Sequence, residues 1–300
     1  MKSDYTRGVM LSFGTALMWG AMSPIAKFMG TKGVDMSSVM CYRTTAIVVV
    51  LGLYFTLRRG FSWLNVGKKL FYSYMLLGML TIVLNATGFM FSCVYLTVPQ
   101  ALMIHYAFPL CTVIGSYFLT KEPPSRMQIL ASIMIIVGLW IGFYGDSNTT
   151  EGISTIGVIC GTLSVIGLAG QTLVTRKVML DTDSDPLIQL FYVHLFGGIV
   201  IVIGKSLLLG WADLAVIDLP VFALMQYHTF CAGLLGFGFM FAALKYVSAS
   251  LVSLICTLEL VFGVIIASLT LGLYPTMGEV IGCAIILASV AAATVPKKSA

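Results

Sequence analysis

The segment ASLVSLICTLELVFGVIIASLTL, residues 249–271, decides the fold class. It is apolar apart from a few hydroxyl side chains and one carboxylate, Glu259. As a helix it is long enough to cross a bilayer core, which takes about 20 residues. The whole chain has this character, because 59% of its 300 residues are hydrophobic and only 10% are charged, whereas soluble proteins carry about 25% charged residues. We therefore predict an all-α polytopic membrane protein and exclude a soluble enzyme and a nucleic-acid-binding protein.

Ten such segments follow one another along the chain. We expect helices at residues 8–29, 36–57, 70–94, 98–119, 124–144, 153–175, 186–208, 220–243, 249–271 and 275–295. Several prolines lie at expected helix starts, where a missing N–H costs nothing. Pro24 and Pro109 instead fall inside expected helices, and each should kink or break its helix because proline removes a backbone hydrogen bond.

The distribution of lysine and arginine predicts the orientation in the membrane. With the N-terminus in the cytoplasm, most of the 17 Lys and Arg residues fall on inner segments, and only Lys27, Lys32 and Lys205 fall on the outer side. Such an excess is the positive-inside pattern. We therefore expect a multi-pass protein of the cytoplasmic (inner) membrane, surrounded by lipid, with both ends in the cytoplasm.

An internal repeat divides the chain. Tyr95 aligns with Tyr246 and Pro124 with Pro275, each pair at the same point of a helix–turn–helix unit. The expected repeats are residues 1–147 and 148–300, with five helices each. Because five is odd, the two repeats would run through the membrane in opposite directions. Inverted repeats of this kind are typical of secondary transporters, whose substrate site lies near the midplane between the halves.

Short motifs along the full length resemble those of one family. In chain order they are Trp19-Gly20 followed by Pro24 and Lys27, then Arg43, Phe108-Pro109, Lys121-Glu122-Pro123-Pro124, Leu258-Glu259-Leu260 and Leu271-Gly272-Leu273-Tyr274-Pro275. Their order resembles the ten-helix, EamA-like branch of the drug/metabolite transporter superfamily. Leu260 and Leu273 depart from the Glu-Pro and Gly-Glu pairs that the family often has there. The resemblance implies that the first, third, fourth, sixth, eighth and ninth helices line the substrate pathway.

Glu259 is the acidic residue that we expect near the centre of a helix, about ten residues from either end. A charge at that depth costs about 2.5–3.5 kcal/mol on insertion scales, so the side chain should face the bundle interior. One interpretation is a protonated carboxyl that bonds a neighbouring helix. The other is a substrate-binding or proton-binding group, since apolar surroundings favour the neutral form and allow proton uptake and release.

Arg43 is the basic residue that we expect well inside a helix, in the outer third of the second one. Its guanidinium stays charged and could grip a substrate carboxylate with two parallel hydrogen bonds. Alternatively, the side chain could extend outward to the interface or pair with Asp35.

Further polar and aromatic side chains are candidates for the substrate site. His105 could pair with Glu259, and with it share a proton, or simply line the cavity. Asn85 and Gln171 could orient a polar substrate or bond another helix. Trp19 could wall a central pocket together with other aromatic side chains, or serve in packing. The full candidate set is Trp19, Tyr42, Arg43, Asn85, Phe89, His105, Tyr106, Phe108, Gln171, His228 and Glu259.

These features predict a secondary transporter for a small amphiphilic metabolite, such as an amino acid, that works by alternating access with or without proton coupling. An importer of choline or another quaternary ammonium compound is the alternative, because aromatic walls and a carboxylate hold organic cations. Histidine spacing gives no metal motif, no cofactor is expected, and no signature of an enzyme or of a nucleotide-binding loop occurs. We expect a monomer or weak dimer, because ten helices can enclose a pathway alone. A receptor that binds a solute without moving it is a further alternative. Measured flux of the solute across the membrane would distinguish a transporter from such a receptor.

Overall fold

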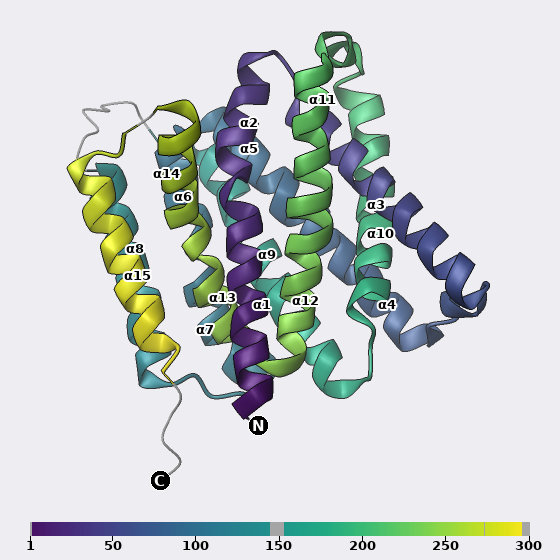
Figure 1. Cartoon of the computed structure of the whole chain (residues 1–300), viewed down its shortest axis with the longest axis horizontal. Helices are drawn as coiled ribbons and strands as arrows, with labels where there is room; N and C mark the ends of the chain where they lie inside the picture. The colour runs from purple at the N-terminus through teal and green to yellow at the C-terminus, as the bar shows by residue number, and fades with distance from the viewer. Residues whose placement is uncertain (1, 145–152, 273, 296–300) are drawn as a thin grey trace.

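The computed structural model describes residues 2–144, 153–272 and 274–295, and every regular element in these residues is helical (Figure 1). The first half contains α1 (Lys2–Gly20), α2 (Met22–Thr31), α3 (Met36–Arg59), α4 (Gly67–Gly78), η2 (Met79–Thr87), α5 (Gly88–Tyr95), α6 (Val98–His105), α7 (Phe108–Leu119) and α8 (Arg126–Tyr144). The second half contains α9 (Thr155–Asp181), α10 (Pro186–Leu208), α11 (Leu219–Gln226), η4 (Tyr227–Gly236), α12 (Phe237–Tyr246), α13 (Ala249–Cys256), α14 (Leu258–Leu271) and α15 (Met277–Ala293). Two short turns, η1 (Ser62–Leu64) and η3 (Ala212–Val216), lie in loops. The predicted boundary between residues 147 and 148 falls outside the described residues.

These elements join into ten rods over the described residues, one for each predicted helix. Eight rods are long and apolar enough to cross a membrane, and α8 and α15 are shorter apolar helices. The start of α1 and the end of α15 lie at the same end of the bundle, as an even number of crossings requires (Figure 1). We call this end the base and the opposite end the top.

The two short rods pair with each other at one edge of the bundle (Figure 1). Glycines let their backbones approach closely: a Cβ on Gly138 would meet the carbonyl oxygen of Gly282 at 3.0 Å, and a Cβ on Gly282 would meet that of Gly138 at 2.5 Å. Small residues serve this purpose in membrane bundles, where lipid tails are as apolar as leucine and close contact stabilises the pair.

The turns that join α5 to α6 and α12 to α13 are copies of one local structure. Each follows a tyrosine that ends its helix, Tyr95 or Tyr246. The N-cap residues are Thr97 (φ −65°, ψ 152°) and Ser248 (φ −64°, ψ 154°), and each hydroxyl accepts a hydrogen bond from the backbone N–H three residues later. Such caps satisfy donors that a helix start leaves free. The turns lie at opposite ends of the bundle (Figure 1).

Three rods are broken near their middle. The breaks expected from proline are present, between Gly20 and Met22 and between His105 and Phe108, just ahead of Pro24 and Pro109. The third break, at Thr257, corrects the prediction of a continuous helix over 249–271. There the N–H of Thr257 bonds the carbonyl of Leu254 three residues back, and its hydroxyl donates to the same oxygen at 2.6 Å. Glu259 therefore lies in the first turn of α14 rather than in mid-helix.

Two further rods contain wide π-helical turns. η2 interrupts the third rod and η4 the eighth, and both rods continue as α-helix on each side. Such turns are rare and often mark functional sites. They bring Asn85, in η2, and His228, in η4, into the buried interior.

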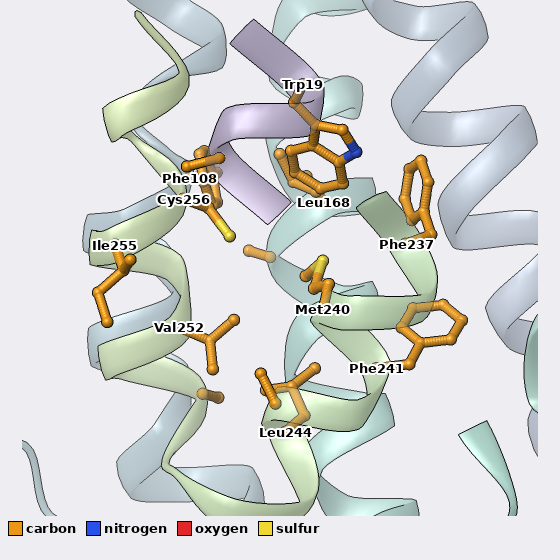
Figure 2. Close-up of a cluster of buried hydrophobic side chains, with 14 of the residues drawn as sticks. Trp19, Phe108, Leu168, Phe237, Met240, Phe241, Leu244, Val252, Ile255 and Cys256 are labelled. Atoms are coloured by element: carbon orange, nitrogen blue, oxygen red, sulfur yellow. The ribbon is translucent and has the colours of Figure 1, made fainter. Parts of the chain in front are cut away.

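The core is densest towards the base. All eight residues of α13 are buried, whereas in α14 almost every residue is at least partly exposed. Figure 2 shows the core beside α13, with Trp19, Phe108 and Cys256 near one end and Val252 and Leu244 towards the other. The interior below the helix breaks is therefore filled with apolar side chains.

Candidate substrate site at the helix breaks

The fourth and ninth rods meet at their breaks through one hydrogen bond. Tyr106 directly follows the end of α6, and its hydroxyl donates to Oε1 of Glu259 in the first turn of α14. The Tyr106 ring is buried, and Glu259 is partly buried. A helix N-terminus carries partial positive charge, so α14 stabilises a carboxylate at this position. No cation forms an ion pair with Glu259 among the described residues.

Aromatic rings surround this bond on the α6 side. The ring of His105 lies 5.4 Å from that of Tyr106, and Phe108 lies 6.2 Å from Tyr106. Phe89 of α5 packs on His105 with ring centres 4.5 Å apart. The four rings form one largely buried cluster, and the Tyr106 hydroxyl joins it to the carboxylate of Glu259, a combination that suits an organic cation.

His105 does not pair with Glu259 in this structure, in contrast to one of the two sequence-based expectations. Its Nδ1 instead lies 2.7 Å from Oγ of Ser164 on α9. The Ser164 hydroxyl donates its proton to Oδ1 of Asn85 at 3.2 Å, so His105 must be the donor to Ser164. Successive helical residues point about 100° apart, so His105 and Tyr106 face different neighbours. His105, Ser164 and Asn85 thus form a hydrogen-bonded series, which is a second polar group near the break.

Ser164 is a site residue that the sequence did not indicate. It is fully buried and joins His105 to Asn85, but a serine in an apolar helix is common and carries no distinctive pattern. The residues around Ser164 in the sequence give no sign of which helix its side chain will face.

Trp19 packs beside the site. Its indole N–H donates to the carbonyl of Ala232 at 3.0 Å, and its ring lies 4.8 Å from that of Phe237. The next residue, Gly20, faces the backbone of Glu259, whose carbonyl oxygen would lie 3.3 Å from a Cβ added there. Trp19 is thus held on one side by η4 and α12, and the adjacent backbone borders α14. Figure 2 shows the indole ring beside Phe237.

Two candidates lie apart from the Tyr106–Glu259 pair. Tyr42 exchanges hydrogen bonds with Gln226 and packs on Phe222, in a separate apolar cluster. Gln171 is fully buried in α9, where its Nε2 contacts the sulfur of Met240 at 3.6 Å and its Oε1 has no partner.

Arg43 neither reaches the interface nor pairs with Asp35. Its side chain is 2% exposed, and its guanidinium lies 5.5 Å from the ring centre of Phe237. Asp35 instead caps α3 and pairs with Lys205 at 3.4 Å. Both sequence-based alternatives to a binding role for Arg43 are therefore wrong, because Lys205 on α10 occupies the carboxylate that Arg43 would need. His228, in η4, lies near Arg43 rather than near Glu259.

The base of the bundle is closed by polar contacts between the two halves. The guanidinium of Arg176 on α9 binds both carboxylate oxygens of Glu122, at 2.6 and 3.1 Å, and donates to the carbonyl of Leu244 at 2.7 Å. Nearby, the hydroxyls of Ser116 on α7 and Ser250 on α13 bond at 2.9 Å. In the sequence, Arg176 is one of the basic residues that indicate orientation, and nothing marks it as a partner of Glu122. The charged loop at residues 121–124 is the feature of the sequence that could indicate this contact.

Comparison with known proteins settles the family. Residues 6–144 and residues 155–295 each match the EamA-like transporter family. The chain belongs to this family. It is therefore a multi-pass membrane transporter of the drug/metabolite transporter superfamily, and not an enzyme. A solved structure described as "Crystal structure of protein" has a TM-score of 0.77 and 15% sequence identity, and the match covers 96% of each chain. At that identity it shows the fold alone. No curated protein sequence matches the chain.

Proposed function

We propose that this EamA-like transporter is a secondary transporter for a small amphiphilic metabolite that carries an amine, such as an amino acid or a related compound. The observation that carries this proposal is the hydrogen bond between Tyr106 and Glu259, which joins the broken helices of the two halves. Because Glu259 has no cation partner among the described residues, an ammonium group is a complementary ligand.

The neighbouring side chains fit the rest of such a substrate. Phe89, Tyr106 and Phe108 offer an apolar face for a carbon skeleton. The linked side chains of His105, Ser164 and Asn85 offer donors and acceptors for a second polar group. Trp19, held in place by Ala232 and Phe237, borders the same region. The candidate site thus combines one carboxylate, that of Glu259, with one neutral group of hydrogen-bonded side chains.

The closed base supports transport by alternating access. We propose that the two five-helix halves are inverted repeats and that the base faces the cytoplasm, since most lysines and arginines lie at that end. Opening towards the cytoplasm would break the Arg176–Glu122 and Ser116–Ser250 contacts and separate the apolar side chains around α13. The energy would come from the solute gradient or from a coupled ion, and Glu259 is the group best placed to carry a proton.

A ligand-stability screen of the purified chain tests the substrate class. Melting temperatures are measured with amino acids, amines and nucleobases, in the wild type and in Glu259→Gln. The proposal expects saturable stabilisation by amine-bearing compounds that is lost in Glu259→Gln. Stabilisation by nucleobases alone, or equal stabilisation of the variant, would overturn it.

A quaternary ammonium substrate is the second candidate. The aromatic surface next to Glu259 favours it, because a trimethylammonium group binds aromatic faces and cannot donate hydrogen bonds. In the same screen, stabilisation by choline with none by zwitterionic amino acids would favour this candidate. The reverse result would exclude it.

A further inference from the structure

Arg43 on α3 is a buried charge, and its described contacts are with Phe237 and with Gly233 rather than with Glu259. The guanidinium faces the ring of Phe237, which in turn packs on Trp19. Gly233 in η4 makes room for the arginine, because a Cβ there would meet Cδ of Arg43 at 2.8 Å. Nε of Arg43 is buried and has no hydrogen-bond partner.

Two buried histidines lie on α10 and η4, the elements that pack against α3 and Arg43. His194 on α10 is 0% exposed and packs on Phe237 with ring centres 6.2 Å apart. His228 in η4 is 2% exposed. Nε2 of His194 and Nδ1 of His228 have no hydrogen-bond partner. Nδ1 of His194 lies 2.9 Å from the carbonyl of Leu190, which can only accept, so Nε2 of this ring is an acceptor when the ring is neutral.

No carboxylate balances this group among the described residues. Asp35 pairs with Lys205, and Glu259 accepts from Tyr106. Buried polar atoms without a protein partner usually bond water or an ion, and a charge inside a membrane protein is rarely left uncompensated. Three side chains with such atoms, Arg43, His194 and His228, come from three different rods.

We propose that Arg43 and His228 form a binding site for a small monovalent anion, a carboxylate or a halide, in the interior between α3, α10 and η4. The guanidinium presents a planar fork of N–H donors that matches a carboxylate. Nδ1 of His228, which has no partner among the described residues, supplies a further donor when it carries the ring proton, and His194 lines the site without donating. The site stands on Arg43 and its neighbours and does not depend on the substrate proposed at Glu259.

Anion titration of the full-length purified chain tests the proposal. Methanesulfonate is replaced stepwise by chloride, bromide or acetate at constant ionic strength, and the melting temperature is recorded. We expect a saturable rise of about 2–4 °C at ten times the dissociation constant. Arg43→Gln should abolish the rise, and Arg43→Lys, which keeps the charge but loses the fork, should weaken binding about tenfold. His228→Phe should raise the half-saturation point at least about fivefold.

A second set of titrations, with amino acids and with the same amines without a carboxylate, identifies the source of the anion. Saturation by chloride or acetate identifies a free anion. Saturation only by amino acids, and not by the same amines without a carboxylate, identifies the carboxyl group of a substrate. A melting temperature that is independent of anion and carboxylate, or a His228→Phe titration identical to the wild type, overturns the proposal even if Arg43→Gln fails to fold. Glu259→Gln should keep the response to chloride or acetate, which carry no amine, so failure here is distinct from failure of the proposed transport site.

Discussion

The fourth and ninth rods break at equivalent places but with different residues. In the first half the break runs through Tyr106 to Phe108-Pro109, and in the second through Thr257 to Glu259. One break supplies the aromatic ring and the hydroxyl, and the other supplies the carboxylate. The difference shows how two similar halves can place different side chains at equivalent breaks, so that each half contributes a different partner to one hydrogen bond.

The largest effect should follow from removal of the charge that only the second break carries. Glu259→Gln keeps the shape of the side chain, and we expect uptake into proteoliposomes to fall at least about 100-fold, because the amine loses its counter-ion. Phe108→Leu, at the equivalent point of the first break, should reduce uptake only a few-fold. Equal rates for the two variants would show that the breaks do not differ in the way described.

The base of the bundle, below the breaks, is held by polar contacts, and Arg176–Glu122 is the most buried ion pair there among the described residues. Arg176→Ala leaves Glu122 without its partner, and the side-chain exposures of 9% and 27% indicate a largely desolvated pair. We expect a loss of about 2 kcal/mol in the free energy of unfolding, somewhat below the 3–5 kcal/mol typical of fully buried pairs. Thermal or denaturant unfolding in detergent measures it.

Lys245→Ala is the matched control for Arg176→Ala. The Lys245–Asp183 pair lies at the same end of the bundle, but its side chains are 42% and 94% exposed. Lys245 lowers the pKa of Asp183 through a hydrogen bond and its charge. The small contribution of this pair is therefore present above the unfolded pKa of Asp183 and is lost as pH falls through the folded value. At neutral pH we expect a much smaller loss of unfolding free energy than in Arg176→Ala, because solvent screens exposed ion pairs. A larger loss of unfolding free energy in Lys245→Ala than in Arg176→Ala would contradict the assignment of the Arg176–Glu122 pair as the ion pair that holds the base closed.

Tyr106→Phe removes the hydroxyl that links the two breaks and keeps the ring. Hydrogen bonds to charged groups contribute about 1.5–3 kcal/mol, so uptake should fall about tenfold. The ligand-induced rise in melting temperature should shrink in parallel. Unchanged transport would mean that Tyr106 acts through its ring alone.

Among the variants at the breaks, Pro109→Ala should have the smallest effect. The second break has no proline, so we infer that packing and i→i−3 hydrogen bonds are enough to keep such a break. The unfolding free energy should change by less than about 1 kcal/mol, with transport preserved. A loss above about 3 kcal/mol, the usual scale of proline effects in helices, would assign the first break to Pro109 itself.

Much of the fold was predictable, because helix length and apolar composition depend on each segment alone. The breaks before Pro24 and Pro109 followed from the chemistry of proline, whereas the break at Thr257 has no such marker. The candidate site was predictable only as residue types. Partners such as Tyr106 for Glu259 and Ser164 for His105 depend on the rotation of each helix about its axis, which no local pattern specifies.

Carbodiimide labelling of Glu259 tests the central claim most directly. The purified chain is treated with a hydrophobic carbodiimide at increasing concentrations of the compound that the stability screen identifies, and labelled peptides are quantified by mass spectrometry. The account predicts that labelling of Glu259 falls in a saturable manner, with a midpoint equal to that of transport, while labelling of Glu279 near the start of α15 is unchanged. Undiminished labelling of Glu259 at saturating substrate would contradict a substrate site at the two helix breaks.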